Sequence, residues 1–504
     1  MKTYDVILFT DMTARFWHAK TLGAYRLASE LRSHGYSTKV VDWFGKWLEN
    51  PTELFKLLSL IVGPNTLFIG FSSTFLIQYE STGNIINDWE SYSSTKVLPQ
   101  DWPIPNNKMD IVLAGIRKKY PHVKLVIGGS KDFTSVMKSV DFIIKGLADS
   151  TIIELASHLK NNTSLKFMPS GKRAKIIDHD TKAVSFNFKQ AQTQYHESDH
   201  IVPGEFMPLE TSRGCLFKCS FCDYPLIGRK KGDPDYHKIV DTMAQEFRSN
   251  YENFGINRYM FVDDTFNETT KKIEEVIQAR DASGVDIEFA CYLRADLLAR
   301  FPEQLPLLKN LGIFSAFLGI ESLYKPSAAS VGKSTDPERI KETIYMMKDQ
   351  CPDLRIEGSF IVGLPEDNPE TLNTWVPWLL QKNNPIDMYR LRVLNINNMF
   401  EGSDIERNPE KFGYIVDPRT KYWKNKFWDK DAAAEYAAEV MQLSWESNRL
   451  KLAAYDQLGI KNYPGVYEKF KDLPINQLDF NLLAEHKETQ WKNYRDIVFA
   501  YESQ

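Results

Sequence analysis

Three of the five cysteines lie within eight residues of one another, in the stretch Arg213-Gly214-Cys215-Leu216-Phe217-Lys218-Cys219-Ser220-Phe221-Cys222. Their spacing is Cys-x3-Cys-x2-Cys, and no fourth cysteine lies near them in the sequence. Thiolate is the ligand that iron–sulfur clusters select, so Cys215, Cys219 and Cys222 can hold three corners of a cubic 4Fe-4S cluster. One iron then has no protein ligand, and an open position on a metal is where a small molecule binds and reacts.

A zinc site, or a non-catalytic iron–sulfur site, is the alternative interpretation of this stretch. Zinc in structural sites normally takes four ligands, whereas the nearest histidines, His196, His200 and His237, lie at irregular distances from the cysteines. The spacing therefore favours iron over zinc.

The cysteine stretch, with Phe221 directly before the last cysteine, resembles the signature of the radical S-adenosylmethionine (SAM) superfamily. The resemblance implies that the open iron chelates the amino and carboxylate groups of SAM, with Phe221 among the SAM contacts. It also implies that one electron from the cluster breaks the sulfonium bond and releases a 5′-deoxyadenosyl radical. An electron donor such as flavodoxin or ferredoxin is then an implied partner.

Residues 206–395 alternate strand-like and helix-like stretches, which predicts a partial, TIM-like (β/α)6 radical SAM barrel. The expected strands are 208–211, 258–262, 286–292, 315–319, 356–362 and 388–394. Chemistry in such barrels gathers at the carboxyl ends of the strands. The cysteine stretch follows the first of them, and so we expect it at that end.

Two further strand ends resemble the positions that hold the SAM amino acid in the family. Asp263, or its neighbour Asp264, is the candidate acceptor for the amino group; a helix-capping role for Asp264 or Asn267 is the alternative. Arg294 is the candidate partner of the carboxylate, through a two-pronged charge-assisted pair. A salt bridge from Arg294 to Asp296 is the alternative.

The next two strand ends resemble the family's nucleoside contacts. Glu321 and Ser322 resemble the ribose motif, because a carboxylate and a hydroxyl can take the two ribose hydroxyls. Ile361 and Gly363 resemble the adenine motif, in which backbone groups pair with the base edge, although Ser359 replaces the first glycine of that motif. A tight strand–turn–helix junction would explain Gly363 without any ligand.

Residues 1–160 show a strand–helix rhythm that predicts a doubly wound, Rossmann-like domain with strands near 5–9, 37–41, 66–70, 124–127 and 141–144. Ligands on such sheets lie beyond the carboxyl ends of the strands. Small residues stand at these ends, at Ser72, Ser73, Gly128, Gly129 and Gly146. They leave room for a large flat ligand, although serine and glycine are also common in ordinary turns.

A doubly wound domain ahead of a radical SAM core resembles the cobalamin-dependent class of the superfamily. The run 140–149 is close to the family's Asp-x-Val-Val-x-Gly-Glu-Gly-Glu, although it ends in Gly146-Leu147-Ala148-Asp149. The cobalt-ligating Asp-x-His-x-x-Gly motif is missing, because Asp11-Met12-Thr13 stands in its place. The small residues at the strand ends become candidate cobalamin contacts. An insert at 75–107 would either cover a bound corrin or fill its pocket.

The remaining segments are expected to be a linker at 161–205, with an alternating run at 174–188 that resembles a hairpin, and a helical C-terminal cap at 396–504. The late aromatic residues are expected to be core residues of this cap and not substrate contacts: Tyr422, Trp423, Phe427, Trp428, Trp445 and Trp491. Cys291 and Cys351, outside the cysteine stretch, are expected to be buried small apolar residues.

Composition narrows the class of protein. The net charge of −4 argues against a nucleic-acid partner. No run of 18 apolar residues indicates a membrane span, and unpaired cysteines suit a reducing, cytoplasmic location. With cobalamin, the family resemblance implies methyl transfer to an unactivated carbon or phosphorus of a small-molecule or peptide substrate. Without it, the resemblance implies a rearrangement, cyclisation or epimerisation.

Overall fold

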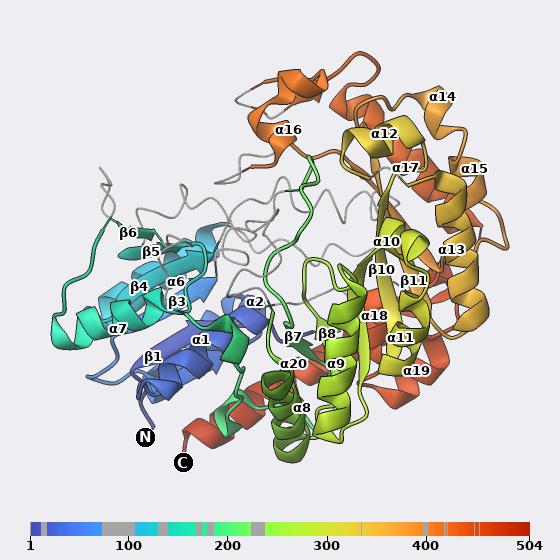
Figure 1. The fold of residues 1–504 in the computed structure, drawn as a ribbon. Coiled ribbons are helices and arrows are strands. Elements are labelled where there is room, and N and C mark those ends of the chain that lie inside the picture. The colour runs from blue at the N-terminus through green and yellow to red at the C-terminus, as the bar shows by residue number, and fades with distance from the viewer. Residues whose placement is uncertain are drawn as a thin grey trace.

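The computed structural model describes residues 2–11, 18–72, 106–129, 140–167, 174–178, 186–222, 237–333, 335–396, 402–417, 420, 422–447, 449–452 and 454–504. Within these residues two six-stranded parallel sheets lie in separate halves of the molecule, each covered by helices (Figure 1). The expected α/β class, with a doubly wound domain before a partial barrel, is confirmed.

The first sheet has the strand order β2-β1-β3-β4-β5-β6. Its strands are β1 (Val6–Phe9), β2 (Thr38–Val41), β3 (Phe68–Ser72), β4 (Lys124–Gly129), β5 (Phe142–Lys145) and β6 (Lys175–Asp178). The connecting helices are α1 (Leu22–Ser33), α2 (Phe44–Glu49), α3 (Pro51–Ile61), α6 (Asn106–Lys119) and α7 (Thr151–Asn161). The order reverses between β1 and β3, which is the place where doubly wound sheets bind ligands.

Side-chain alternation explains why both faces of this sheet are covered. In β1, Ile7 and Phe9 belong to one buried cluster with α2, α3 and α6, whereas Val6 and Leu8 belong to another with α1 and α7. Successive residues of a strand point to opposite faces, so an uninterrupted apolar run needs helices on both sides.

Strand β6 is not among the strands expected for this sheet. Its residues fall in the segment for which the sequence suggests a hairpin, yet Lys175–Asp178 pairs in parallel with β5. The sheet therefore extends past residue 160, while residues 179–185 lie outside the described part. An alternating run predicts a strand, but the run itself does not specify the tertiary contacts that decide which strand it pairs with.

The second sheet is an open barrel wall with the order β12-β11-β10-β9-β8-β7. Its strands are β7 (Met207–Leu209), β8 (Arg258–Phe261), β9 (Glu288–Arg294), β10 (Ile313–Glu321), β11 (Arg355–Val362) and β12 (Met388–Val393). All six expected strands are present. The helices between them are α8 (Val240–Phe254), α9 (Thr270–Ser283), α10 (Ala295–Arg300), α11 (Gln304–Leu311), α12 (Lys325–Ser330), α13 (Pro337–Gln350), α14 (Pro369–Leu372) and α15 (Val376–Leu379).

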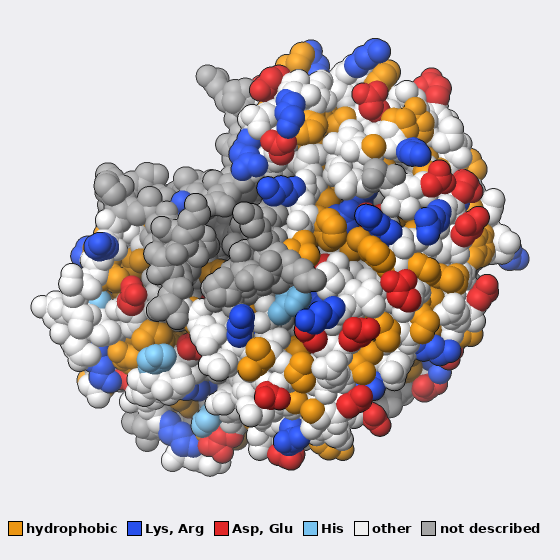
Figure 2. Space-filling view, in the orientation of Figure 1, with side chains coloured by type: hydrophobic (Ala, Val, Ile, Leu, Met, Phe, Trp, Pro, Cys, Tyr) orange, Lys and Arg blue, Asp and Glu red, His pale blue; other side chains and the backbone are white. Residues whose placement is uncertain are grey.

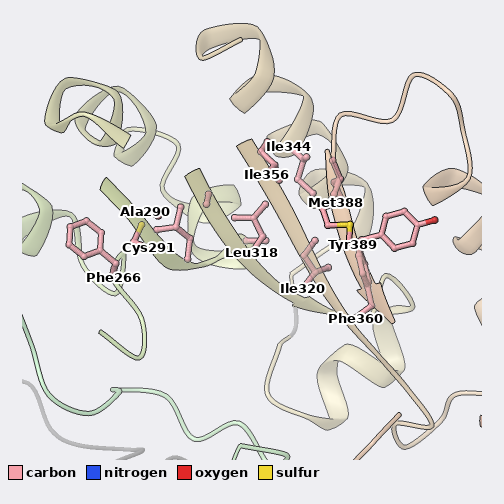
Figure 3. Close-up of a cluster of buried hydrophobic side chains, with 14 of the residues drawn as sticks. Phe266, Ala290, Cys291, Leu318, Ile320, Ile344, Ile356, Phe360, Met388 and Tyr389 are labelled. Carbon is pink, nitrogen blue, oxygen red and sulfur yellow. The ribbon is translucent and has the colours of Figure 1, made fainter. Parts of the chain in front are cut away.

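The core of the barrel wall lies between strands and helices. Figure 3 shows Leu318 and Ile320 of β10, Ile344 of α13 and Cys291 of β9, which belong to one buried hydrophobic cluster. Cys291 is fully buried and Cys351 is 8% exposed, so the expectation that both are small core residues is confirmed. Burial raises the pKa of the Cys291 thiol well above its usual value.

The C-terminal region is helical, but it does more than cap the barrel. Its helices are α16 (Asp404–Arg407), α17 (Lys430–Glu446), α18 (Ala454–Ile460), α19 (Pro464–Phe470) and α20 (Phe480–Glu502). Helix α17 packs on β11 and β12, and α18 packs on β9, β10 and β11. The last helix, α20, instead returns to the first sheet, where Trp491 and Val498 are buried, and it brings the two chain ends together (Figure 1).

The surface carries charge of both signs. On the face shown in Figure 2, acidic and basic side chains alternate with small apolar groups over the barrel helices. Among the described residues no helix combines the length and apolarity that a membrane crossing would require.

A buried ion pair ties α20 to the first sheet. Lys39 Nζ and Glu502 Oε1 lie 2.7 Å apart with both side chains fully buried, and the Tyr4 hydroxyl donates to Glu502. Removing one member of a buried pair leaves an uncompensated charge, so we expect Glu502→Gln to lower the free energy of unfolding by about 3 kcal/mol. Glu488→Gln on the same helix, whose side chain is 41% exposed, is the control and should change it by less than about 1 kcal/mol. Urea denaturation checks this, and equal effects would contradict it.

Candidate functional site

The three cysteines of the motif share one short turn at the carboxyl end of β7. Cys215 and Cys219 are buried and Cys222 is half-buried. Gly214 has φ +78°, a left-handed conformation that glycine adopts freely, and this conformation lets the chain turn directly before Cys215. The Cys222 N–H donates to the Cys219 carbonyl over 3.1 Å. The three cysteines therefore lie on one turn after β7, although among the described residues no three His, Cys, Asp or Glu side chains lie close enough together to hold a metal ion.

Asp263, at the end of β8, holds the chain that leads into this turn. Its Oδ1 accepts hydrogen bonds from the Thr211 N–H (2.7 Å) and the Ser212 N–H (3.2 Å), and its Oδ2 accepts one from the Thr211 hydroxyl. Lys272 Nζ lies 2.8 Å from Oδ2. Burial alone would raise the pKa of Asp263, but Lys272 and the Thr211 donors outweigh it and hold the pKa below its usual value. Asp263 thus positions the cysteine turn.

The neighbouring carboxylate, Asp264, is in a different environment. It is half-buried and receives none of the hydrogen bonds that hold Asp263. Burial, together with the negative charge of Asp263, raises the pKa of Asp264 to about 6. A cation placed beside Asp264 would reverse this shift. Of the two aspartates, Asp263 is the one that holds the cysteine turn, and Asp264 takes no part in those hydrogen bonds.

Arg294, at the end of β9, reaches the cysteine turn directly. Its Nη1 donates to Cys219 Sγ over 3.0 Å, and the guanidinium carbon lies 4.1 Å from the centre of the Phe217 ring. Nε and Nη2 donate to the two oxygens of Asp296, over 3.0 and 2.7 Å. The salt bridge to Asp296 that the sequence leaves open is present. It uses Nε and Nη2, two of the three guanidinium nitrogens.

Glu321 and Ser322 lie at the end of β10, where the pairing with β11 shifts register. Glu321 has φ +67°, which is uncommon for a residue with a side chain and costs about 1 kcal/mol or more. Lys333 Nζ lies 2.8 Å from Glu321 Oε1 and also donates to the Gly319 carbonyl. Lys333 is a partner of Glu321 that the sequence did not assign. The fragment Gly332-Lys333-Ser334 resembles the end of a phosphate-binding loop. That motif needs a glycine at position 327, where this sequence has serine, so the sequence excludes a phosphate loop here.

The end of β11 is closed by aromatic residues from the C-terminal region. Gly363 has φ +88°, and its carbonyl accepts a hydrogen bond from the Tyr414 hydroxyl over 2.6 Å. The indole of Trp423, fully buried, packs where a Cβ of Gly363 would lie. The core role expected for the late aromatic residues holds at Trp423, Trp428 and Trp491, but it is wrong for Phe427, which is 41% exposed. Ile361, two residues earlier, is 9% exposed.

These contacts give a prediction for Gly363→Ala. A methyl group there would overlap Trp423 in addition to straining a positive φ, so we expect about 3 kcal/mol of destabilisation. Gly413 is the matched control, because it has φ +81° and nothing lies within 4 Å of the place that a methyl group would take, and Gly413→Ala should cost about 1 kcal/mol. Thermal unfolding of the two variants measures the difference, and equal losses would refute the Trp423 contact.

In the first sheet, four of the five candidate cofactor residues lie on neighbouring strand ends. Ser72 ends β3, Gly128 and Gly129 end β4, and Gly146 follows β5. Gly129 and Gly146 have φ of +130° and +78°, and the Gly146 N–H donates to the Gly129 carbonyl. Ser73 and most of the insert at 75–107 lie outside the described residues. The edge formed by these strand ends is lined by backbone and small side chains.

A network of ion pairs around Asp149 joins this edge to the cysteine turn. Asp149, in the loop after β5, receives two hydrogen bonds from Arg213, with N–O distances of 2.7 and 3.1 Å. Arg213 also donates to Glu210 over 2.7 Å, and Arg26 Nε lies 3.4 Å from Asp149. Arg213 stands two residues before Cys215. The last carboxylate of the run 140–149 is thus a contact between the two halves, which the sequence did not assign.

Comparisons with known proteins agree with this arrangement. The family model described as the radical SAM superfamily matches residues 209–376. The chain is 24% identical over 251 residues to an uncharacterized methyltransferase of Pyrococcus horikoshii, covering 47% of this chain and 52% of the relative. It is 27% identical over 277 residues to an anaerobic magnesium-protoporphyrin IX monomethyl ester cyclase of Rubrivivax gelatinosus, covering 50% and 48%. The chain thus spans about half the length of these curated relatives.

The fold also matches a solved structure. The radical SAM methyltransferase TsrM from Kitasatospora setae, with cobalamin and a 4Fe-4S cluster bound, superposes with a TM-score of 0.62 at 13% identity. The match covers 92% of this chain and 96% of TsrM, so it includes the doubly wound half as well as the barrel. The family match over 209–376 thus falls on the barrel and its cysteine turn, and the superposition shows that the chain shares the two-domain fold of TsrM.

Proposed function

We propose that the protein is a cobalamin-dependent radical SAM methyltransferase acting on an unactivated carbon. The observation that carries the proposal is the single turn at the end of β7 that presents three thiols with the cationic Arg294 beside them. The relatives named as methyltransferases support the reaction class. Radical SAM chemistry without cobalamin, giving rearrangement, cyclisation or epimerisation, is the second candidate, because the cobalt-ligating motif is missing.

The donor set of the cysteine turn suits a 4Fe-4S cluster, and the three thiols would have to turn toward one another to hold it. Cys215, Cys219 and Cys222 supply three sulfur donors, and the Arg294 N–H directed at Cys219 suits a sulfur that carries negative charge. Burial raises the pKa of the Cys215 thiol, a penalty that a bound metal would remove by taking the thiolate. When bound, the cluster supplies one electron to SAM and provides the open iron for its amino and carboxylate groups.

The strand ends provide polar groups for the rest of SAM. Asp264 takes the amino group, since its raised pKa marks a carboxylate that a cation would stabilise, and Asp263 serves as its support. Glu321 and Ser322 bind the ribose hydroxyls. The ion pair between Lys333 and Glu321 either opens or persists when the ribose binds. The backbone around Ile361–Gly363 takes the adenine edge, and Phe221 borders the nucleoside.

Cobalamin is assigned to the edge formed by Ser72, Ser73, Gly128, Gly129 and Gly146. The support is the strand order, in which Ser72 of β3 borders the reversal between β1 and β3, and the positive φ of two glycines on the neighbouring strand ends. The ion pair between Asp149 and Arg213 joins this edge to the cysteine turn. A reaction that uses both cofactors on one substrate requires the two sites to be held together in this way. The substrate is a small molecule or peptide, the electron donor a flavodoxin or ferredoxin, and the location cytoplasmic.

The test uses protein from a cobalamin-supplied host, purified without oxygen. We expect about four iron and four sulfide per chain, formation of 5′-deoxyadenosine from SAM, and a corrin absorption that stays with the protein through gel filtration. SAM cleavage without any corrin would leave the cobalamin-free candidate. Zinc in place of iron would contradict both.

A further inference from the structure

The guanidinium of Arg294 makes a buried hydrogen bond to a cysteine of the motif. Nη1 lies 3.0 Å from Cys219 Sγ, the Arg294 side chain is 7% exposed, and Cys219 is 8% exposed. The sulfur of Cys215 has a neutral neighbour instead, the Thr265 hydroxyl at 3.4 Å. The Cys219 sulfur is thus held directly against a positive charge in a region with little water.

We propose that Arg294 raises the reduction potential of the cluster through its hydrogen bond to Cys219, and that Asp296 limits this increase. The proposal rests on the proposed function, since it requires a cluster on the three cysteines. A positive charge and an N–H donor at a cluster sulfur stabilise the extra negative charge of the reduced state, and hydrogen bonds to sulfur are a known determinant of cluster potential. Burial strengthens the effect, because little water screens it.

Asp296 provides the opposing charge. Both of its oxygens accept hydrogen bonds from Arg294, and its side chain is 12% exposed. Burial would raise the pKa of Asp296, but Arg294 and Lys333 outweigh it and hold the pKa below its usual value. Asp296 is therefore ionised at neutral pH. Removing its charge should leave the guanidinium more strongly positive toward Cys219.

The same geometry argues against a primary role for Arg294 in holding SAM. Its Nε and Nη2 face Asp296, its Nη2 also donates to the Gly332 carbonyl over 3.3 Å, and its Nη1 faces Cys219. A carboxylate ligand would have to displace one of these partners. Arg294 is accordingly a positioning and tuning residue, and the concentration of SAM needed for half-maximal cleavage should depend on it weakly.

The experiment is a redox titration of the reconstituted cluster, followed by electron paramagnetic resonance, in four variants and the wild type. In Arg294→Gln we expect a lower midpoint, equivalent to about a tenfold smaller equilibrium constant for reduction, or about 59 mV for one electron. Arg294→Lys should recover part of this loss because it keeps the charge. Asp296→Asn should shift the midpoint upward. Arg300→Gln, an exposed arginine of α10, is the control and should leave it unchanged.

The outcomes separate this inference from the function on which it rests. A wild-type protein that assembles no cluster contradicts both. A cluster that forms and cleaves SAM, but whose midpoint is the same in Arg294→Gln, overturns the inference alone. So do shifts of the same sign in Arg294→Gln and Asp296→Asn, which would indicate a structural disturbance. A more than tenfold rise in KM for SAM at constant midpoint would assign Arg294 to the SAM carboxylate instead. Should Arg294→Gln fail to bind iron, the upward shift in Asp296→Asn still decides.

Discussion

Replacing Cys222 with alanine is expected to abolish SAM cleavage while leaving the fold intact. Cys222 is the half-buried member of the three cysteines, so its truncation leaves no large cavity in the core. It removes one of three thiolates, however, and a cluster held by two has lost a corner. Formation of 5′-deoxyadenosine and the iron content of anaerobically reconstituted protein are the measurements, with far-ultraviolet circular dichroism to follow the fold.

Cys351→Ala is the matched control for this variant. Cys351 lies at the end of α13, outside the cysteine turn, and is buried to a similar degree as Cys219. Its replacement should preserve both iron content and SAM cleavage. Retained cleavage in Cys222→Ala, or equal loss in the two variants, would count against the assignment of the cluster to the motif.

Replacing Lys272 with methionine is expected to destabilise the protein by about 5 kcal/mol, because it leaves two buried carboxylates without their cation. Lys272 Nζ lies 2.8 Å from both Asp263 Oδ2 and Glu268 Oε1, and it donates to the Ser212 hydroxyl over 2.6 Å. All of these side chains are buried. Since Asp263 holds the backbone of Thr211 and Ser212, we also expect a lower iron content on reconstitution.

The adjacent Lys271 gives a matched control on the same helix. Its side chain is 70% exposed, and its partner Glu275 lies 3.3 Å away at the surface. Lys271→Met should change the free energy of unfolding by less than about 1 kcal/mol, as surface ion pairs do. Chemical denaturation of both variants measures the difference. If the two variants were equally stable, the ion pairs of Lys272 with Asp263 and Glu268 would not be what holds the cysteine turn in place.

Much of the fold follows from local sequence. Apolar runs such as Val6–Phe9 and residues 142–144 are uninterrupted because helices cover both sides of the sheet, and this pattern identifies parallel strands without any tertiary information. The three thiols of the motif are close together for a similar reason, since eight residues on one turn cannot lie far apart. Where strands are parallel, the residues that follow them meet at one edge, which brings Asp263, Arg294 and Glu321 together.

The partners of those residues could not be predicted in the same way. Arg294 contacts Cys219, which is 75 positions away, and Asp263 contacts Thr211, 52 positions away. Such pairs depend on how strands align in the barrel, and no local pattern encodes that alignment. The same holds for α20, whose amphipathic sequence indicates a buried face but not that the face belongs to the first sheet.

The response of the reduced cluster to SAM tests the central claim most directly. Anaerobically reconstituted protein, reduced and examined by electron paramagnetic resonance with and without SAM, should show a 4Fe-4S signal whose shape changes when SAM binds the open iron. A signal that is identical in the presence and absence of SAM, or a preparation that holds zinc and gives no signal, would contradict the account.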